Sequence, residues 1–256
     1  MKIELPTLRA RHIWSRNRDV FKKFALSSIL PYFAEPLLFI LALGYGLGIF
    51  VGEINGVSYA QFLAPGILSS SAMFAASYEC TYSTFVRMIF QKTFDAILCT
   101  PLMVEDIVLG EILWGATKSL ISGICIFIVI LALGLISLES AVIIIPTIII
   151  VGLMFSSLSM FFTSIVPTID SFNYYFTLLV SPMFLLSGVF FPIENLPPIV
   201  KDISWWLPLT HAVNIIRSAA LGEHNPSFLL DISWMIVFTL IFYALSTVLM
   251  KKRLIQ

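Results

Sequence analysis

Four ionisable residues stand in stretches of the sequence that are otherwise apolar: Glu35, Glu79, Glu111 and Lys118. An isolated charge is costly in apolar surroundings, so each of these side chains is by default a candidate for function. Glu35 directly precedes Pro36. It is therefore either a functional carboxylate or a cap at the start of a helix, where a negative charge favours the helix dipole.

The residues that enzymes use for catalysis do not form a recognisable set. The three histidines are His12, His211 and His224, and the sequence contains no H-E-x-x-H, G-x-S-x-G or G-x-x-x-x-G-K-[ST] motif. His211 follows Thr210 and could act as a base, but no nucleophile pairs with it by sequence. We expect His211 to be a hydrogen-bonded residue. The three cysteines show no C-x-x-C pair, and we expect no metal site.

The composition indicates an integral membrane protein built from α-helices. The chain has 256 residues, of which 59% are hydrophobic and 12% charged, and the mean hydropathy is +0.97. Soluble domains carry roughly 25% charged residues, and a soluble core could not cover this much apolar surface. The formal net charge is zero, so nothing points to a nucleic acid partner.

Windows of about 20 apolar residues predict six transmembrane helices in one domain, residues 1–256. The predicted spans are residues 31–50, 60–82, 107–134, 141–166, 172–191 and 229–250. Of the fifteen Lys and Arg residues, seven precede the first span, two lie between the second and third, and three follow the sixth. The positive-inside rule therefore places both termini in the cytoplasm.

Glu111 and Lys118 both fall in the third predicted span, on one helix face and two turns apart. Each pairs either with a neighbouring helix or with the polar membrane surface, which a long side chain reaches by snorkelling. We expect Lys118 to snorkel. Glu79 lies near the inner end of the second span, between Tyr78 and Tyr82.

Residues 84–99 predict an amphipathic helix on the cytoplasmic side, before Pro101. Apolar residues recur at helical spacing, and Arg87, Gln91 and Asp95 follow each other four apart, with Lys92 beside them. Its apolar face can rest on the ends of two spans, which leaves the polar face for a soluble partner. The pattern fits equally a helix that only stabilises the turn.

Two further segments do not fit a simple serpentine. Residues 5–24 mix basic and large apolar residues and predict either an amphipathic interfacial helix or a basic topology anchor. Residues 187–226 are too apolar for an outer loop and too rich in proline to span, so they predict two short helices, 197–206 and 209–221, that either re-enter the outer interface or pack back on the bundle. The candidate functional residues of this outer re-entrant segment are Glu194, Trp205, Trp206, His211 and Arg217.

Together these parts resemble the permease of type-2 ABC exporters, over essentially the whole chain. Two stretches carry the resemblance: FDAILCTPLMVEDIVLGEILWGATKSLISG (94–123) and LLSGVFFPIENLPPIVKDISWWLPLTHAVNIIRSAALG (185–222). The chain looks nearest to the subgroup of nodulation lipo-oligosaccharide export permeases.

The resemblance implies an exporter subunit of the bacterial inner membrane that pairs as a homodimer and binds two copies of a separate ABC ATPase. ATP and magnesium would then bind to the ATPase, and this chain would bind no cofactor. Residues 84–99 would be the coupling helix, with Arg87, Gln91, Lys92 and Asp95 at the contact. The cargo would be amphipathic: a glycolipid, lipo-oligosaccharide, lipid or drug.

Residues for the transport path and for the dimer carry weaker signals. Tyr78, Glu79, Tyr174 and Tyr175 suit an amphipathic cargo, but aromatic residues suit helix packing equally well. A G-x-x-x-G pattern in residues 44–48 allows close helix approach. Two other classes compete with the exporter subunit: an intramembrane enzyme that acts on a lipid, and a stand-alone channel.

Overall fold

The structure is a computed structural model that describes residues 6–223 and 225–255, and nearly all its elements are helices. The first half contains α1 (Ala10–Lys23), α2 (Ala25–Phe39), α3 (Gly48–Val51), α4 (Tyr59–Tyr78), α5 (Thr93–Leu98) and α6 (Val104–Ala132). The second half contains α7 (Ala141–Ile165), α8 (Phe172–Tyr175), α9 (Ser181–Leu186), α10 (Pro198–Trp206), α11 (Pro208–Leu221) and α12 (Phe228–Leu254). Two short strands, β1 (Glu53–Ile54) and β2 (Val57–Ser58), pair antiparallel.

Several helices continue through stretches of π-helix. Ile40–Leu47 joins α2 to α3, and Phe176–Val180 joins α8 to α9. Glu79–Ser83 and Val86–Phe90 extend α4, so that the chain is helical without a break from Tyr59 to Phe90. Short π-helical stretches inside α-helices often mark functional positions, and the stretches beyond α4 contain two of the charged residues considered below.

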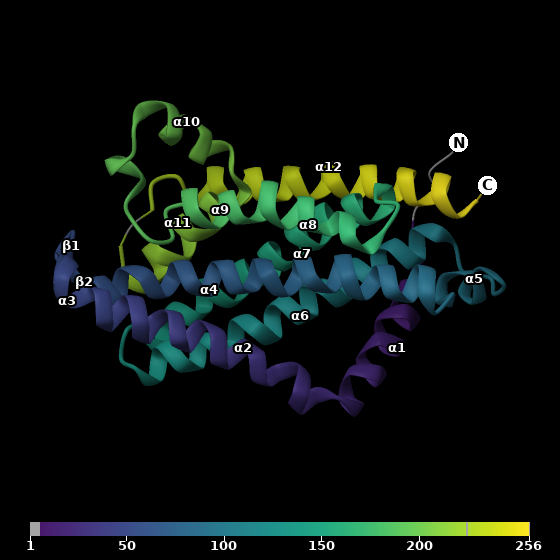
Figure 1. Cartoon of the computed structure of the whole chain (residues 1–256), viewed down its shortest axis with the longest axis horizontal. Helices are drawn as coiled ribbons and strands as arrows, with labels where there is room; N and C mark the ends of the chain where they lie inside the picture. The colour runs from purple at the N-terminus through teal and green to yellow at the C-terminus, as the bar shows by residue number, and fades with distance from the viewer. Residues whose placement is uncertain (1–5, 224, 256) are drawn as a thin grey trace.

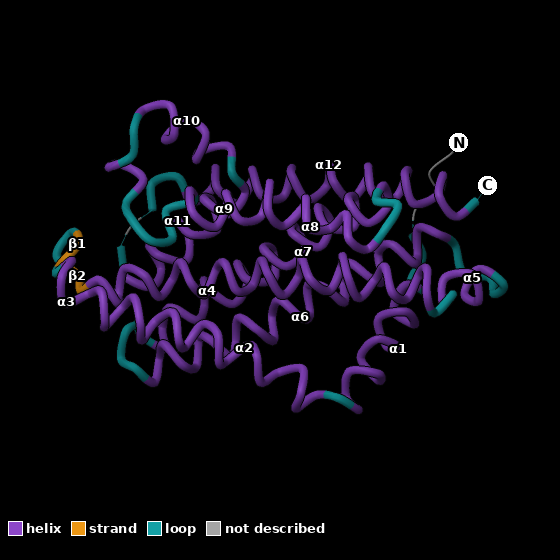
Figure 2. Tube along the Cα trace, in the orientation of Figure 1, coloured by secondary structure: helices purple, strands orange, loops and turns teal. Residues whose placement is uncertain are grey.

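The long helices lie side by side in an elongated bundle (Figure 1). Helix α7 is central and contacts α4, α6, α11 and α12, while α1 and α2 both lie against α6. Figure 2 shows that most turns gather at the two ends of the bundle, while the turn between α1 and α2 lies at its side. We call the two ends the α5 end, where both described chain ends also lie, and the α10 end, which carries α10, α11 and the strand pair.

Four helical segments among the described residues are long and apolar enough to cross a membrane. They are Ser28–Val51, Val104–Ala132, Leu138–Ile165 and Phe228–Leu254, and they overlap the first, third, fourth and sixth predicted spans. The second and fifth predicted spans are helical but are not among these four.

The second predicted span differs because α4 is covered by protein along most of its length. A helix inside a bundle can carry serines, since their hydroxyls donate to carbonyls of the same helix, as Ser69 does to Pro65 at 2.8 Å. In the fifth span, α8, α9 and the π-helix between them cover only residues 172–186. This is shorter than the roughly 20 residues that a helix perpendicular to the membrane needs to cross it.

Residues 84–99 do not form the single helix that their periodicity predicts. The helix that begins with α4 continues to Phe90, and α5 begins only at Thr93. Between them Lys92 adopts a left-handed conformation with φ of 52°, which is uncommon for a residue with a side chain. Residues before and after Lys92 therefore do not share a helix face, and the predicted alignment of Arg87 and Gln91 with Asp95 is wrong.

The predicted helix at residues 5–24 corresponds to α1, while residue 5 lies outside the described part. Helix α1 is fastened to α6 rather than lying apart from the bundle. The Trp14 indole donates to Thr117 Oγ1 at 2.9 Å, and the Thr7 amide donates to Asp106 Oδ1 at 2.6 Å. A shift of α1 would therefore pull on α6.

The α10 end contains two short helices within one residue of the predicted bounds, α10 and α11. Helix α11 is buried on one side and contacts α4, α7 and α12. The strand pair was not predicted. Its signal in the sequence is the dipeptide Asn55-Gly56, because these residue types tolerate the positive φ that a tight hairpin turn requires, and both adopt it here.

The contact between α1 and α6 depends on the absence of a side chain at Gly110. A Cβ atom there would lie 2.7 Å from Ile13 Cβ and 2.9 Å from the Ala10 carbonyl oxygen, closer than packed atoms approach. Gly110→Ala should therefore lower the free energy of unfolding by about 1–3 kcal/mol, the usual cost of overpacking. Thermal unfolding in detergent measures this.

Gly46→Ala is the matched control, because the nearest atom to a Cβ there is 3.7 Å away. This variant should be neutral within about 0.5 kcal/mol. Equal destabilisation by the two substitutions would show that the close contact at Gly110 is not the cause.

Candidate functional site

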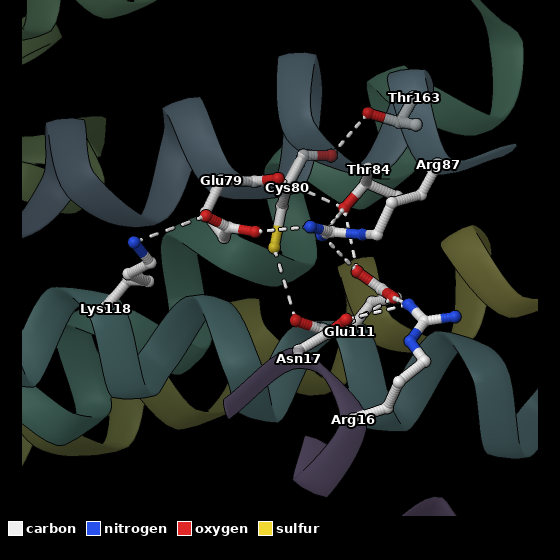
Figure 3. Close-up of polar contacts among 9 residues, drawn as sticks. All are labelled: Arg16, Asn17, Glu79, Cys80, Thr84, Arg87, Glu111, Lys118 and Thr163. Carbon is white, nitrogen blue, oxygen red and sulfur yellow. Dashed lines mark hydrogen bonds and ion pairs between the residues drawn. The ribbon is translucent and has the colours of Figure 1, made fainter. Parts of the chain in front are cut away.

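Charged side chains from three separate parts of the chain meet inside the α5 end of the bundle (Figure 3). They come from α1, from the π-helical extension of α4, and from α6. We call this set the charged cluster; its members are Arg16, Asn17, Glu79, Arg87, Glu111 and Lys118. Their positions in sequence span about a hundred residues, so only folding brings them together.

Arg87 is the centre of the charged cluster. Its Nη1 donates to Glu79 Oε1 at 2.8 Å, and its Nη2 donates to Glu111 Oε2 at 2.5 Å. The Arg87 side chain is only 15% exposed. A guanidinium is suited to this place, because its planar fork can serve two carboxylates at once and it stays protonated. The predicted role of Arg87 at the ATPase contact requires an exposed charge. The structure instead buries this charge between two carboxylates.

Glu111 connects all three parts of the chain. Besides Arg87, its carboxylate accepts hydrogen bonds from Asn17 Nδ2 at 3.1 Å, Thr84 Oγ1 at 3.1 Å and Arg16 Nη2 at 3.4 Å. The Glu111 side chain is completely buried. A buried carboxylate is tolerated when it is paired and its lone pairs are satisfied, and this one is held by donors from α1 and from the extension of α4.

Lys118 does not snorkel to the membrane surface, contrary to the prediction. Its side chain is 9% exposed, with Nζ 3.9 Å from Glu79 Oε2. Nζ also lies 4.1 Å from the centre of the Phe21 ring of α1, which is within the range of a cation–π contact. The alternative prediction, pairing with a neighbouring helix, is the one that the structure adopts for both Glu111 and Lys118.

The surroundings of the charged cluster are apolar. Phe85, Met88, Phe94, Ile107 and Ile112 belong to one hydrophobic core at this end of the bundle. Such an environment strengthens each ion pair and also makes an unpaired charge expensive. Burial lowers the pKa of the Arg16 guanidinium below its ordinary value, while the nearby Glu111 carboxylate acts in the opposite direction.

The remaining predicted contact residues lie at the break between the α4 extension and α5. Gln91, Lys92 and Asp95 are all exposed. Lys92 Nζ and Asp95 Oδ2 are 3.9 Å apart with both side chains more than half exposed, a pair that contributes little to stability. Phe94, between them in sequence, is fully buried and fixes α5 to the bundle. Within the described chain, these three polar side chains contribute little to the stability of the fold.

The predicted path residues separate into different environments. Tyr175 is buried, and its hydroxyl lies 3.2 Å from Ser77 Oγ and 2.9 Å from Ser159 Oγ, whereas Tyr174 is 70% exposed. Tyr78 is half exposed and stacks on Phe176.

Glu35 is exposed in the middle of α2, which begins at Ala25. The interpretation as a cap at a helix start is therefore wrong. Glu35 and Tyr78 line one cavity of about 230 Å³ together with Ser70 and Ser71.

At the α10 end, His211 is a buried hydrogen-bonded residue. Its Nδ1 lies 2.7 Å from Asp231 Oδ1 and its Nε2 lies 2.9 Å from the Trp205 carbonyl oxygen. Arg217 stacks over Phe62, 3.9 Å from the ring centre, and donates to backbone carbonyl oxygens.

Trp205, Trp206 and Glu194 are exposed. The exposed tryptophans fit a place at the height of lipid headgroups.

Sequence reasoning missed Arg16 and Asn17 as members of the charged cluster. A signal was present for Asn17, because Ala10, Ile13 and Asn17 follow helical spacing and are the buried residues of α1. A polar residue on the buried face of a helix needs a partner. The sequence could not show that this partner is Glu111, 94 residues further along the chain.

Arg87→Gln should lower the free energy of unfolding by about 3–5 kcal/mol, because it leaves two buried carboxylates without their main counter-ion. The control is Lys92→Gln, which removes the same charge from an exposed pair and should cost less than about 1 kcal/mol. Thermal unfolding of both variants in detergent measures the difference. Similar stability of the two would mean that Arg87 does not neutralise the buried carboxylates.

Comparison with known proteins identifies the family to which this helical bundle belongs. Residues 10–221 match the ABC-2 type transporter family. Nodulation protein J of Rhizobium leguminosarum bv. trifolii is 41% identical over 244 residues, which cover 95% of this chain and 93% of that protein. Nodulation protein J of Rhizobium meliloti is 40% identical over 242 residues, covering 94% and 92%.

A more distant relative is the inner membrane transport permease YadH of Escherichia coli. It is 24% identical over 242 residues, which cover 94% of each chain. The match of the family over most of the chain agrees with the apolar helices of the bundle and with the resemblance seen in the sequence. The chain belongs to the ABC-2 type transporter family and is a membrane transport permease.

Proposed function

We propose that this permease is the membrane-spanning subunit of an ABC exporter, driven by a separate ATPase that docks on the α5 end. The sequence contains no P-loop motif, so the proposal assigns the binding and hydrolysis of ATP to another chain. The observation that carries the proposal is the exposed polar turn at Gln91, Lys92 and Asp95. It is fixed to the bundle by the buried Phe94.

A force applied to α5 has a direct route into the bundle. Helix α5 is followed closely by α6, and it follows the helix that runs from Tyr59 to Phe90. The charged cluster joins these two helices to each other and to α1 through Arg87 and Glu111. ATP can drive transport only if it stabilises one conformation of the permease more than another, and a rigid connection from the docking turn to long helices makes that possible.

The proposal includes a homodimer that binds two copies of the ATPase, with both termini in the cytoplasm. Both described chain ends lie at the α5 end, as an even number of spans requires (Figure 1). An amphipathic cargo such as a glycolipid or lipo-oligosaccharide fits the mixed lining of the cavity at Glu35 and Tyr78, which combines a carboxylate and hydroxyls with aromatic rings. Stimulation of ATP hydrolysis by candidate lipids and glycolipids would identify the cargo class.

Exchanging the two charges of the docking turn should prevent association with the ATPase. Lys92→Glu combined with Asp95→Lys keeps the net charge, and both side chains are exposed, so folding should be unaffected. We expect co-purification of the ATPase and transport to be lost. The matched control is Lys201→Glu with Asp202→Lys, an exposed pair at the α10 end that should change neither. Normal co-purification with the first variant would contradict the docking assignment.

Cysteine labelling tests the orientation. Native Cys99 follows α5 and is exposed, while Cys80 and Cys125 are buried. A membrane-impermeant maleimide should reach Cys99 only from the cytoplasm. Lys201→Cys in a Cys99→Ser background should be labelled from outside. Ser204 is unsuitable for this purpose because it is fully buried. Labelling of residue 201 from the cytoplasm alone would reverse the proposed orientation.

A further inference from the structure

A polar pocket opens beside the charged cluster, between α1 and the end of the helix that extends α4. Its volume is about 560 Å³, and Arg16, Asn17, Arg87 and Gln91 are among the residues that line it. None of the lining residues carries a negative charge. Glu79 and Glu111 are not among the lining residues, so the pocket offers cationic and neutral polar groups to a ligand.

The charges inside the cluster do not balance. Arg16, Arg87 and Lys118 carry three positive charges, whereas Glu79 and Glu111 carry two negative ones. Arg87 already bridges both carboxylates at short distances, whereas Lys118 and Arg16 make only the longer contacts of 3.9 Å to Glu79 and 3.4 Å to Glu111.

Arg16 is the weakly paired cation that lines the pocket. Its closest carboxylate contact is 3.4 Å, and its side chain is 30% exposed, so an ion from solution or from the membrane can reach it. An excess positive charge at the edge of an apolar core favours uptake of a counter-ion.

Two guanidinium nitrogen atoms next to the pocket lack partners. Arg16 Nη1 and Arg87 Nε are buried and make no hydrogen bond with the described residues. Buried polar groups are nearly always hydrogen-bonded, and a guanidinium matches the geometry of a phosphate or carboxylate. Both arginines border the same pocket. An anion seated there could reach both after small side-chain movements, and it would neutralise the excess charge.

We propose that this pocket binds the phosphate headgroup of an anionic phospholipid from the same membrane leaflet. The walls favour a lipid over a soluble anion, because Val20 and Val86 lie next to the arginines and Val20 is 54% exposed. Phe24, one turn beyond Val20, is also exposed. A headgroup at Arg16 would thus have apolar surface beside it for its acyl chains, and basic pockets between helices at this height suit anionic lipids.

The bound lipid would act as a regulator of the permease. It would complete the contact between α1 and the α4 extension, since Arg16 belongs to one and Arg87 to the other. The stability of this contact would then depend on the anionic lipid content of the membrane. The inference does not require the ATPase, so it can be tested on the permease alone.

The test is a titration of the purified full-length chain in neutral detergent with phosphatidylglycerol, followed by thermal unfolding. We expect the unfolding temperature to rise with phosphatidylglycerol and much less with phosphatidylcholine, whose headgroup is neutral. Arg16→Gln should weaken the apparent affinity roughly ten-fold, the loss of one charge-assisted hydrogen bond. Arg11→Gln is the matched control: it removes the same group from an exposed position of α1 that does not line the pocket, and it should keep the affinity within about two-fold.

A second variant adds a charge without removing a cluster residue. Val20→Glu places a carboxylate at the exposed edge of the pocket and should weaken phosphatidylglycerol binding as strongly as Arg16→Gln. Equal responses of Arg16→Gln and Arg11→Gln would overturn the proposal. A full shift with inorganic phosphate alone would also overturn it, in favour of a soluble anion. Loss of ATPase co-purification in Arg16→Gln with unchanged lipid binding would instead assign the pocket to an acidic side chain of that partner.

Discussion

The pairing of Arg87 with Glu79 and Glu111 is the interaction on which the α5 end of this permease depends. Three charges are placed in apolar surroundings, where each would be prohibitively costly alone. Together they are tolerated because one guanidinium satisfies two carboxylates and the remaining lone pairs find other donors. Removal of any one of these three residues would leave a buried charge unpaired and lower the stability of the fold. The cluster therefore holds α1, the α4 extension and α6 in one arrangement.

Between residues 87 and 95 the chain passes from a buried, fixed side chain to exposed ones. Arg87 is buried in the charged cluster, whereas Lys92 and Asp95 are exposed beyond the left-handed break. Beyond the break, α5 lies at the end of the bundle (Figure 1), and its residue Phe94 is fully buried. A protein that docks on the exposed turn would contact a surface that is directly connected to long helices, and the same geometry leaves the pocket at Arg16 open beside it.

Much of the fold could be predicted, because hydrophobic length is a local property. The helical class, four of the spans and the two helices at the α10 end follow from runs of apolar residues and from prolines. The predicted span at residues 60–82 is helical but is not among the four apolar candidates, because α4 is covered by protein and can carry polar residues. The prediction was wrong for residues 84–99, which are divided by Lys92, whose left-handed conformation no periodicity indicates.

For the site, the sequence alone determined which residues needed an explanation. Glu79, Glu111 and Lys118 are ionisable residues in apolar stretches, and the cost of burying a charge marked them without any structure. Only the tertiary structure decided their partners: it placed Arg87 between the two carboxylates, where periodicity had assigned it to the surface, and it brought Asn17 to Glu111. Spacing along a helix defines which residues share a face, but the partner of that face comes from another helix, and its identity is settled by packing between distant segments.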